Sequence, residues 1–315
     1  MPAPDVRIYN NQLVRTIPLD GISIRSDVLL GNEKGEEKES AQNRVKKIVS
    51  KLTPALQRIL RPDEVVLHAM SARSPLSILE QLTSAWWTAL LAACAIVVTN
   101  RRILFFPVKH NGGWRESVRA VQWGDLAELK TKGLLICNAT FKFKNGTKAT
   151  YTNIRRADAK KFTAIASALI PAASGEQTAA GGFAQLCPDC CNVLTPGQYS
   201  CASCGLIFKN EKTMILRSIF LPGGGYFYTG HPLIAILPAV VEAFFMLEIV
   251  LILSAGLSKP EAIPDLMVFL LLMLLFWAFE TAVTILHCRR YVRDYIPEKR
   301  DPARSPLGAT GTTRG

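Results

Sequence analysis

The chain has 315 residues, of which 49% are hydrophobic, and its 37 Lys and Arg outnumber its 25 Asp and Glu to give a net charge of +12. This length predicts two or three folded units, and the concentration of apolar residues between about 232 and 287 excludes a uniformly soluble chain. The positive charge fits nucleic acid, anionic lipid or the topology signal of a membrane protein.

Residues 1–60 are expected to form N-terminal strands, a charged loop and an amphipathic helix. Residues 1–11 are polar and lack the apolar segment of a secretory signal, so we expect this part of the chain to stay in the cytosol. Apolar residues recur at helical spacing over 41–60, which predicts a helix. Pro54 lies inside that pattern and is expected to bend or interrupt the helix.

Residues 61–172 have the pattern of a small β-sheet domain capped by a helix. Alternating apolar runs predict strands near 64–70, 95–99, 103–108, 118–123, 129–132, 134–143 and 148–154. Asn145-Gly146 between the last two is a strong hairpin signal. A helix is predicted over 157–170. The expected fold class is therefore a multidomain α+β chain with an added membrane part.

Three segments carry a family resemblance: Val98-Thr-Asn-Arg-Arg-Ile-Leu-Phe105, Trp123-Gly-Asp-Leu-Ala-Glu-Leu129 and Phe143-Lys-Asn-Gly-Thr147. Together they resemble the bacterial pleckstrin-homology-like family, which is related to the GRAM type. The resemblance covers about 60–172 and implies a binding domain, since eukaryotic members often bind phosphoinositides or peptides. Two interpretations apply to the basic residues of this domain: a rim that contacts lipid or a partner, and an ordinary solvated face, which we prefer for most of them. The residues are Arg101, Arg102, Lys109, Arg115, Lys130 and Lys132.

The sequence departs from that family by an insertion over 77–94, which contains Trp86 and Trp87. One interpretation is a helix followed by a buried strand, and another is an interfacial helix whose tryptophans lie at headgroup depth. A full membrane span would divide the sheet between two compartments, so we reject it. Small residues over 173–183 predict a linker.

Residues 184–211 hold the clearest motif of the chain, two Cys-x-x-Cys knuckles formed by Cys187 with Cys190 and Cys201 with Cys204. Two such knuckles complete the tetrahedral shell that zinc prefers, and four thiolates leave no position open for catalysis. Disulfides are disfavoured in the cytosol, whereas a redox dithiol and an iron–sulfur cluster remain alternatives. Cys191 is expected to be a bystander.

The segment resembles the short zinc ribbons of many bacterial membrane proteins, a resemblance that implies contacts with other proteins. Zinc ribbons that bind nucleic acid present basic and aromatic residues, and here Tyr199, Phe208, Lys209 and Lys212 offer little such surface. Nucleic acid is therefore disfavoured as a partner.

Residues 214–290 form the predicted membrane region, with apolar spans over 233–255 and 266–286. The polar turn 256–265 contains two prolines, so we expect a hairpin. Basic residues before the first span and after the second predict a multi-pass protein of the inner membrane with both termini in the cytosol. The tail 297–315 is expected to be disordered.

Before the first span, Pro222-Gly-Gly-Gly-Tyr-Phe-Tyr-Thr-Gly230 is expected to form a re-entrant or interfacial turn. It weakly resembles the two-transmembrane-helix domain family. Glu242, Glu248 and Glu280 lie inside the apolar runs, where carboxylates usually face protein, water or a partner. Glu242 and Glu280 fall at comparable depth and are expected to share a proton, to meet a cation of another subunit or to pack in a homo-oligomer.

These observations favour a non-enzymatic, membrane-anchored adaptor that presents the sheet domain and the zinc ribbon to the cytosol. Its expected partner is a protein or an anionic lipid. The alternative is a channel or transport component that uses the intramembrane glutamates. It would have to be oligomeric, because one hairpin alone has too few helices for an ion path.

Overall fold

The computed structural model describes residues 16–19, 22–25, 39–80, 92–109, 111–173, 181–258 and 263–298. The chain divides into two compact units. Of the described residues, the first unit holds those up to 77 and 92–206, and the second holds 78–80 and 207–298.

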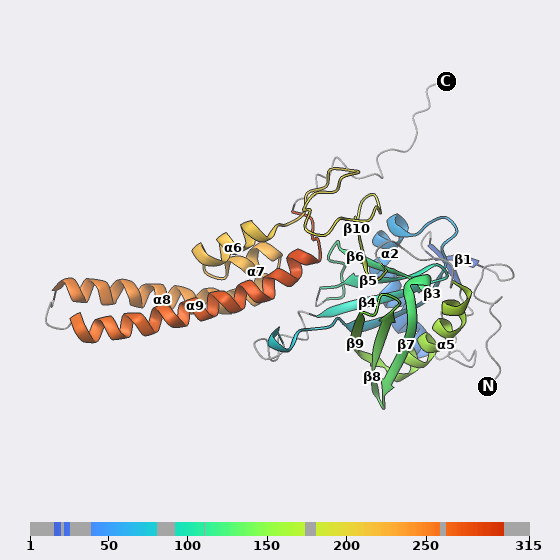
Figure 1. The fold of residues 1–315 in the computed structure, drawn as a ribbon, viewed down its shortest axis with the longest axis horizontal. Coiled ribbons are helices and arrows are strands. Elements are labelled where there is room, and N and C mark those ends of the chain that lie inside the picture. Colours follow the sequence, from blue (N-terminus) through green and yellow to red (C-terminus); the bar gives the residue numbers. More distant parts are fainter. Residues whose placement is uncertain are drawn as a thin grey trace, which may run out of the picture. The chain divides into compact units, whose positions relative to one another are not determined.

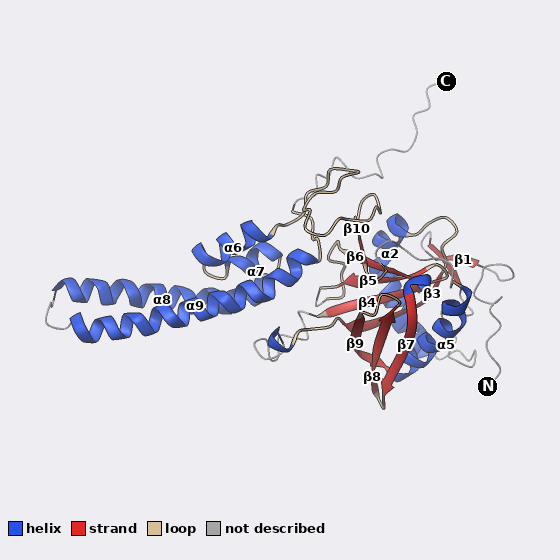
Figure 2. Cartoon of the chain, viewed as in Figure 1, coloured by secondary structure: helices blue, strands red, loops and turns tan. Residues whose placement is uncertain are grey.

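The first unit is built on one sheet, whose strands are shown in red in Figure 2. Its strand order is β10-β6-β5-β4-β3-β9-β8-β7, and β2 pairs in parallel with β3 and antiparallel with β1. The strands are β1 Thr16–Leu19, β2 Ile22–Arg25, β3 Val66–Arg73, β4 Ala93–Thr99, β5 Arg102–Pro107, β6 Val118–Gln122, β7 Leu126–Gly133, β8 Ile136–Phe143, β9 Lys148–Arg155 and β10 Ala184–Leu186. The remaining pairs are antiparallel, and β3 meets β9 only at Arg73 and Thr152.

One apolar core of this unit includes helix α5, Arg156–Ala172. Alternation along β5, β8 and β9 directs Phe105, Phe141 and Tyr151 toward this core, where their rings contact one another at centroid distances of 4.7–5.5 Å. Phe162 of α5 packs on Phe141. This order of strands followed by a terminal helix confirms the predicted helix-capped sheet domain.

A second core includes helix α2, Glu39–Ile59, and residues of β2, β3, β4, β5, β6 and β10. Its apolar stripe buries Val49, Leu52 and Leu56 almost completely. The expected interruption at Pro54 is wrong, because the helix continues through this residue. Proline removes one backbone donor, and the burial of Leu52 and Leu56 on either side offsets that loss.

The second unit contains helices α6 Glu211–Phe220, α7 Gly224–Thr229, α8 Pro232–Ser258 and α9 Ile263–Arg293. In Figure 1, α8 and α9 run side by side as a long pair. Segments Pro232–Ser254 and Met267–Arg293 are long and apolar enough to cross a membrane. Many of their large apolar side chains, such as Leu233, Leu247 and Leu272, are more than half exposed within the chain.

The glycine segment before α8 forms the short helix α7, and its expected re-entrant or interfacial placement remains a prediction. A Cβ added at Gly224 would lie 2.1 Å from the carbonyl oxygen of Arg217, and one at Gly225 would lie 2.2 Å from Oγ of Ser218. Only glycine therefore lets α7 pack this closely against α6. Gly223 precedes the helix at φ 63°, in the left-handed region.

Other expected segments are described only in part. Trp86, Trp87 and most of the insertion lie outside the described residues, as do 174–180 of the linker and 299–315 of the tail. At the end of the linker, the ring of Phe183 lies 5.2 Å from that of Phe105. At the start of the tail, Pro297 bridges to Phe208.

Candidate metal centre and binding surfaces

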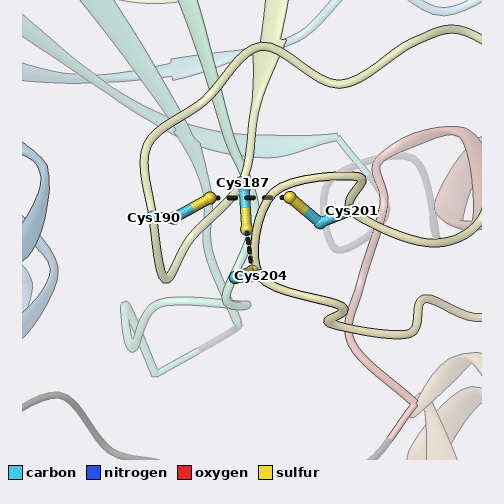
Figure 3. Close-up of side chains that lie close together, drawn as sticks. All are labelled: Cys187, Cys190, Cys201 and Cys204. Atoms are coloured by element: carbon cyan, nitrogen blue, oxygen red, sulfur yellow. Dashed lines mark hydrogen bonds between the residues drawn. The ribbon is translucent and has the colours of Figure 1, made fainter.

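The four predicted ligand sulfurs converge at one point of the first unit. Figure 3 shows the side chains of Cys187, Cys190, Cys201 and Cys204 directed toward one another. All four sulfurs lie within 4.8 Å of one another. The Sγ atoms of Cys187 and Cys204 are 3.6 Å apart, and those of Cys190 and Cys201 are 3.5 Å apart. Each close contact joins one knuckle to the other.

The two knuckles repeat one backbone pattern. The N–H of Cys191 donates to the carbonyl of Cys187, as that of Gly205 does to Cys201, at 3.0 and 2.9 Å. Cys191 and Gly205 thus hold equivalent positions, and both have positive φ, 61° and 73°. A non-glycine residue is uncommon in this conformation, so packing must hold Cys191 there.

Electrostatics within the cluster favour thiolates unequally. Burial raises the pKa of the Cys187 thiol, although backbone N–H groups of Cys190 and Asp189 oppose this. At Cys201 burial also acts to raise the pKa, but the N–H groups of Cys204 and Ser203, together with the thiols of Cys190 and Cys204, outweigh it and lower the pKa to about 7. Amide donors aimed at sulfur are what a metal-bound thiolate needs.

The sulfur positions fit a tetrahedral metal ion. With Zn–S bonds of about 2.3 Å, the edges of an ideal tetrahedron of sulfurs measure about 3.8 Å. The separations between the two knuckles of 3.5 and 3.6 Å are close to that value, and all four sulfurs lie within 4.8 Å of one another. The four cysteines can therefore hold one metal ion, with no coordination position left for substrate.

The knuckles are fixed to the sheet rather than suspended from it. Strand β10 enters the first knuckle and pairs with β6 through Leu186 and Val118. Cys191 does not join the cluster. Its Sγ lies 3.3 Å from the carbonyl oxygen of Arg58 at the end of α2, and the Arg58 guanidinium reaches Asp189 at 4.0 Å.

The part of the first unit that runs from β3 to α5 is similar to a known protein family. Residues 60–167 match the family model of the bacterial PH domain. No curated protein matches the chain significantly. The match agrees with the sheet and capping helix, and it supports a binding role for this PH-like domain. The GRAM relation and the two-transmembrane-helix resemblance remain predictions.

The basic rim expected on the PH-like domain is wrong for Arg102. This side chain is 3% exposed and donates from Nε and Nη2 to the two carboxylate oxygens of Glu64, both at 2.9 Å. Glu64 also accepts from Thr99, and Arg102 donates to the carbonyl of Ile59. Arg102 and Glu64 therefore form a buried structural ion pair, in which the planar guanidinium donors match the two carboxylate oxygens.

The other expected rim residues come from the β4–β5 turn, the β5–β6 connection and β7. Arg101 is exposed and ion-paired with Asp63. Arg115 is half-buried, and its Nε donates to the carbonyl of Val108 at 3.0 Å, within the β5–β6 connection. Lys109 is exposed. Lys130 pairs with Glu128 at 2.7 Å on β7, and Lys132 is exposed near the end of that strand.

The structure brings together two of the three glutamates that lie in the candidate membrane spans. Glu242 of α8 is 2% exposed, and the carboxyl of Glu280 on α9 lies close enough to affect its ionisation. Glu242 Oε2 accepts from the N–H of Gly223 at 2.8 Å, whereas its Oε1 and Glu280 Oε2 are buried without a donor. Glu248 is half-buried and lies further along α8, outside this pair.

Sequence reasoning missed several polar contacts around this pair. Tyr226 of α7 shares a 2.6 Å hydrogen bond with Nδ1 of His287, and Thr229 contacts His231 at 3.1 Å. Glycine and tyrosine in one short segment were the available signal, since buried tyrosine hydroxyls usually find a partner. Sequence reasoning also missed three exposed apolar side chains, Leu134, Leu135 and Ile136, at the β7–β8 turn. Two leucines in a hairpin turn were the signal for these.

Proposed function

We propose that this protein is a non-enzymatic, membrane-anchored adaptor. Its PH-like domain and a structural zinc ribbon recruit a protein or lipid to the cytosolic face of the inner membrane, and α8 and α9 hold them there as a transmembrane hairpin. The observation that carries the proposal is the association, in one chain, of a domain matching the bacterial PH family with two helices apolar enough to span a membrane.

The exposed surface of the helical pair supports the membrane anchor. Leu247, Val250 and Leu272 are each more than half exposed. Exposing each of these apolar side chains to water would cost free energy. In a bilayer the same side chains face lipid, and the helices satisfy their own backbone hydrogen bonds. The pair is therefore better suited to a bilayer than to water.

Charge supports the proposed orientation. Lys212 and Arg217 precede α8, while Arg289, Arg290 and Arg293 close α9. Basic residues flanking spans mark the cytoplasmic side, so both ends of the hairpin belong there. The four thiols also need a reducing compartment to remain available to a metal.

Zinc is the metal we assign to the four cysteines. A closed shell of four thiolates from two knuckles is a structural zinc arrangement, and the metal would supply folding energy to a segment with few buried apolar side chains. Attachment through β10 and Cys191 makes the ribbon an extension of the PH-like domain. Recruitment is thus assigned to one combined surface.

The test is co-purification of the full-length protein from cross-linked membranes, followed by identification of what accompanies it. We expect a specific protein or anionic lipid to accompany the wild type and to be lost from a variant that cannot hold the metal, Cys187→Ser with Cys190→Ser. Cys191→Ala is the matched control and should keep the partner. Absence of any specific protein or lipid would overturn the adaptor proposal.

A second candidate function, a proton or ion path in an oligomer, is favoured by the Glu242–Glu280 pair. Two buried carboxylate oxygens without donors would be satisfied by one shared proton. Glu242→Ala with Glu280→Ala should abolish proton flux in proteoliposomes if the pair conducts, whereas an adaptor would keep its partner. Glu248→Ala serves as the control, since Glu248 lies outside the pair. Flux unchanged in the double variant would exclude this candidate.

A further inference from the structure

The hairpin between β7 and β8 ends in three consecutive aliphatic side chains that face solvent. Leu134, Leu135 and Ile136 are 75%, 80% and 59% exposed. Single exposed apolar residues are ordinary on protein surfaces, but a run of three at the tip of a hairpin is a defined apolar projection. We refer to these three residues as the apolar tip.

The leucine side chains do not hold the turn together. Gly133, at φ 145°, brings the strands close, because a Cβ there would lie 2.2 Å from the carbonyl oxygen of Ile136. The carbonyl of Leu135 accepts from the N–H of Arg156 at 3.2 Å. The backbone thus fixes the turn, and its side chains are left to make contacts elsewhere.

The hairpin at the other end of β8 is built from ordinary turn chemistry. There Gly146 has φ 84°, and Asn145 Oδ1 accepts from the N–H of Thr147 at 3.0 Å. Asn-Gly is the favoured pair for such a turn, whereas leucine is not. One sheet therefore carries one hairpin suited to water and one whose turn residues are suited to an apolar environment.

Positive charge surrounds the apolar tip. Lys132 precedes Gly133 in β7, Arg155 is the register partner of Ile136, and Arg156 follows it. All three are exposed, and none of the ion pairs seen among the described residues involves them. An aliphatic projection with a basic collar matches an anionic bilayer, whose acyl region takes the leucines while its headgroups take the cations.

We propose that the apolar tip, with Lys132, Arg155 and Arg156, is a membrane-docking site of the PH-like domain for a bilayer containing anionic phospholipid. A protein partner is less well matched, because interface centres favour aromatic residues and Arg in packed pockets rather than a protruding aliphatic turn. The inference rests on the proposed membrane anchor, which keeps the domain close to lipid.

The experiment places a tryptophan at the tip of the full-length protein. Leu135→Trp is compared with Asn145→Trp, the matched control in the opposite hairpin, and with the wild type, whose own tryptophans set the background. Each protein is incorporated into nanodiscs of phosphatidylcholine with or without phosphatidylglycerol, with bromine on the acyl chains. We expect the added Leu135→Trp emission to be quenched roughly twofold more than that of Asn145→Trp when phosphatidylglycerol is present, because an inserted ring meets bromine.

A second variant tests the collar in the same assay. Adding Lys132→Gln, Arg155→Gln and Arg156→Gln to Leu135→Trp should remove most of the extra quenching, and so should high salt. Equal quenching in both hairpins, or no quenching at either, would overturn the inference. Quenching that ignores the collar and the phosphatidylglycerol would overturn the assignment to anionic lipid. Failure of the membrane anchor would show differently, since the protein would not enter nanodiscs at all.

Discussion

Five cysteines crowd into the ribbon, but only four of them can share an ion. Cys191 occupies the position that Gly205 fills in the second knuckle, and its sulfur turns to the carbonyl of Arg58 instead of the cluster. The hydrogen bonds of the two knuckles are otherwise the same. Cys191 is therefore a packing residue, and it provides an internal control for any experiment that removes a ligand.

We expect the purified wild type to carry about one zinc ion per chain. Cys201→Ser should lose most of it, because the shell would be incomplete, and the segment 187–206 should become sensitive to protease as its folding energy is lost. Cys191→Ala should keep the metal. Elemental analysis of the purified proteins gives the result, and equal zinc in wild type and Cys201→Ser would contradict the assignment.

A second residue-scale prediction concerns His68 on β3, which is 2% exposed beside Asp158 and Lys161. Burial lowers the pKa of His68, despite the opposing effect of the Asp158 carboxylate, whose Oδ1 lies 3.5 Å from His68 Nε2. At Asp158 burial acts to raise the pKa, but His68 and Arg44 outweigh it and the pKa is lowered. Both lowered pKa values therefore make the folded state less stable in acid, because burial penalises protonated His68 and protonated Asp158 loses its interactions with His68 and Arg44.

The sign for His68 follows from linkage. The unfolded chain takes up a proton near pH 6.5, whereas the folded chain resists it, so stability should fall as pH drops below about 6.5 at a rate of at most about 1.4 kcal/mol per pH unit. Thermal unfolding of the full-length protein in detergent between pH 8 and about 5 measures this. His68→Gln should flatten the dependence, and an unchanged slope in that variant would refute the role of His68.

At the scale of elements, the close packing of α7 depends on its glycines. Gly224→Ala would place a methyl group 2.1 Å from the Arg217 carbonyl, so the helices must separate. We expect a loss of about 1–3 kcal/mol in stability, as for other overpacked sites. Phe227→Ala removes a half-exposed ring from the same helix and serves as a control. Thermal unfolding in detergent compares them, and equal melting temperatures for Gly224→Ala and wild type would argue against the tight packing.

Sequence periodicity predicted the elements of the first unit better than their pairing. Strands such as β4 and β8 alternate or are wholly apolar, so their positions were readable from the residues. Two other features depend on contacts between distant segments. One is the core that α2 forms with the strands, and the other is the extension of the sheet to the ribbon by the three residues of β10. Local pattern carries no information on these.

The candidate site divides in the same way. The cysteine ligands were predictable because their spacing alone fixes the chemistry. Arg102 was misassigned because its burial depends on Glu64, which lies 38 positions away in the chain. The apolar tip was missed because its residues look like the start of a strand, and only the turn geometry shows that they are exposed.

For the whole molecule, the two units call for different environments. The first unit carries thiols that need a reducing aqueous compartment, and the second exposes helical surfaces suited to lipid. That the protein is an adaptor and not an enzyme remains a prediction, and so do the domain boundaries expected from the sequence. A membrane hairpin with both ends on one side is the simplest arrangement that serves both units.

The most direct test of this account is protease accessibility of the first unit in sealed membranes. The membranes are first washed with carbonate, which should leave the protein in the pellet. Protease added to inside-out vesicles should then digest residues up to about 206 and spare a fragment containing α8 and α9, while intact spheroplasts should protect the first unit. Release of the protein by carbonate, or digestion of the first unit from outside intact spheroplasts, would contradict the account.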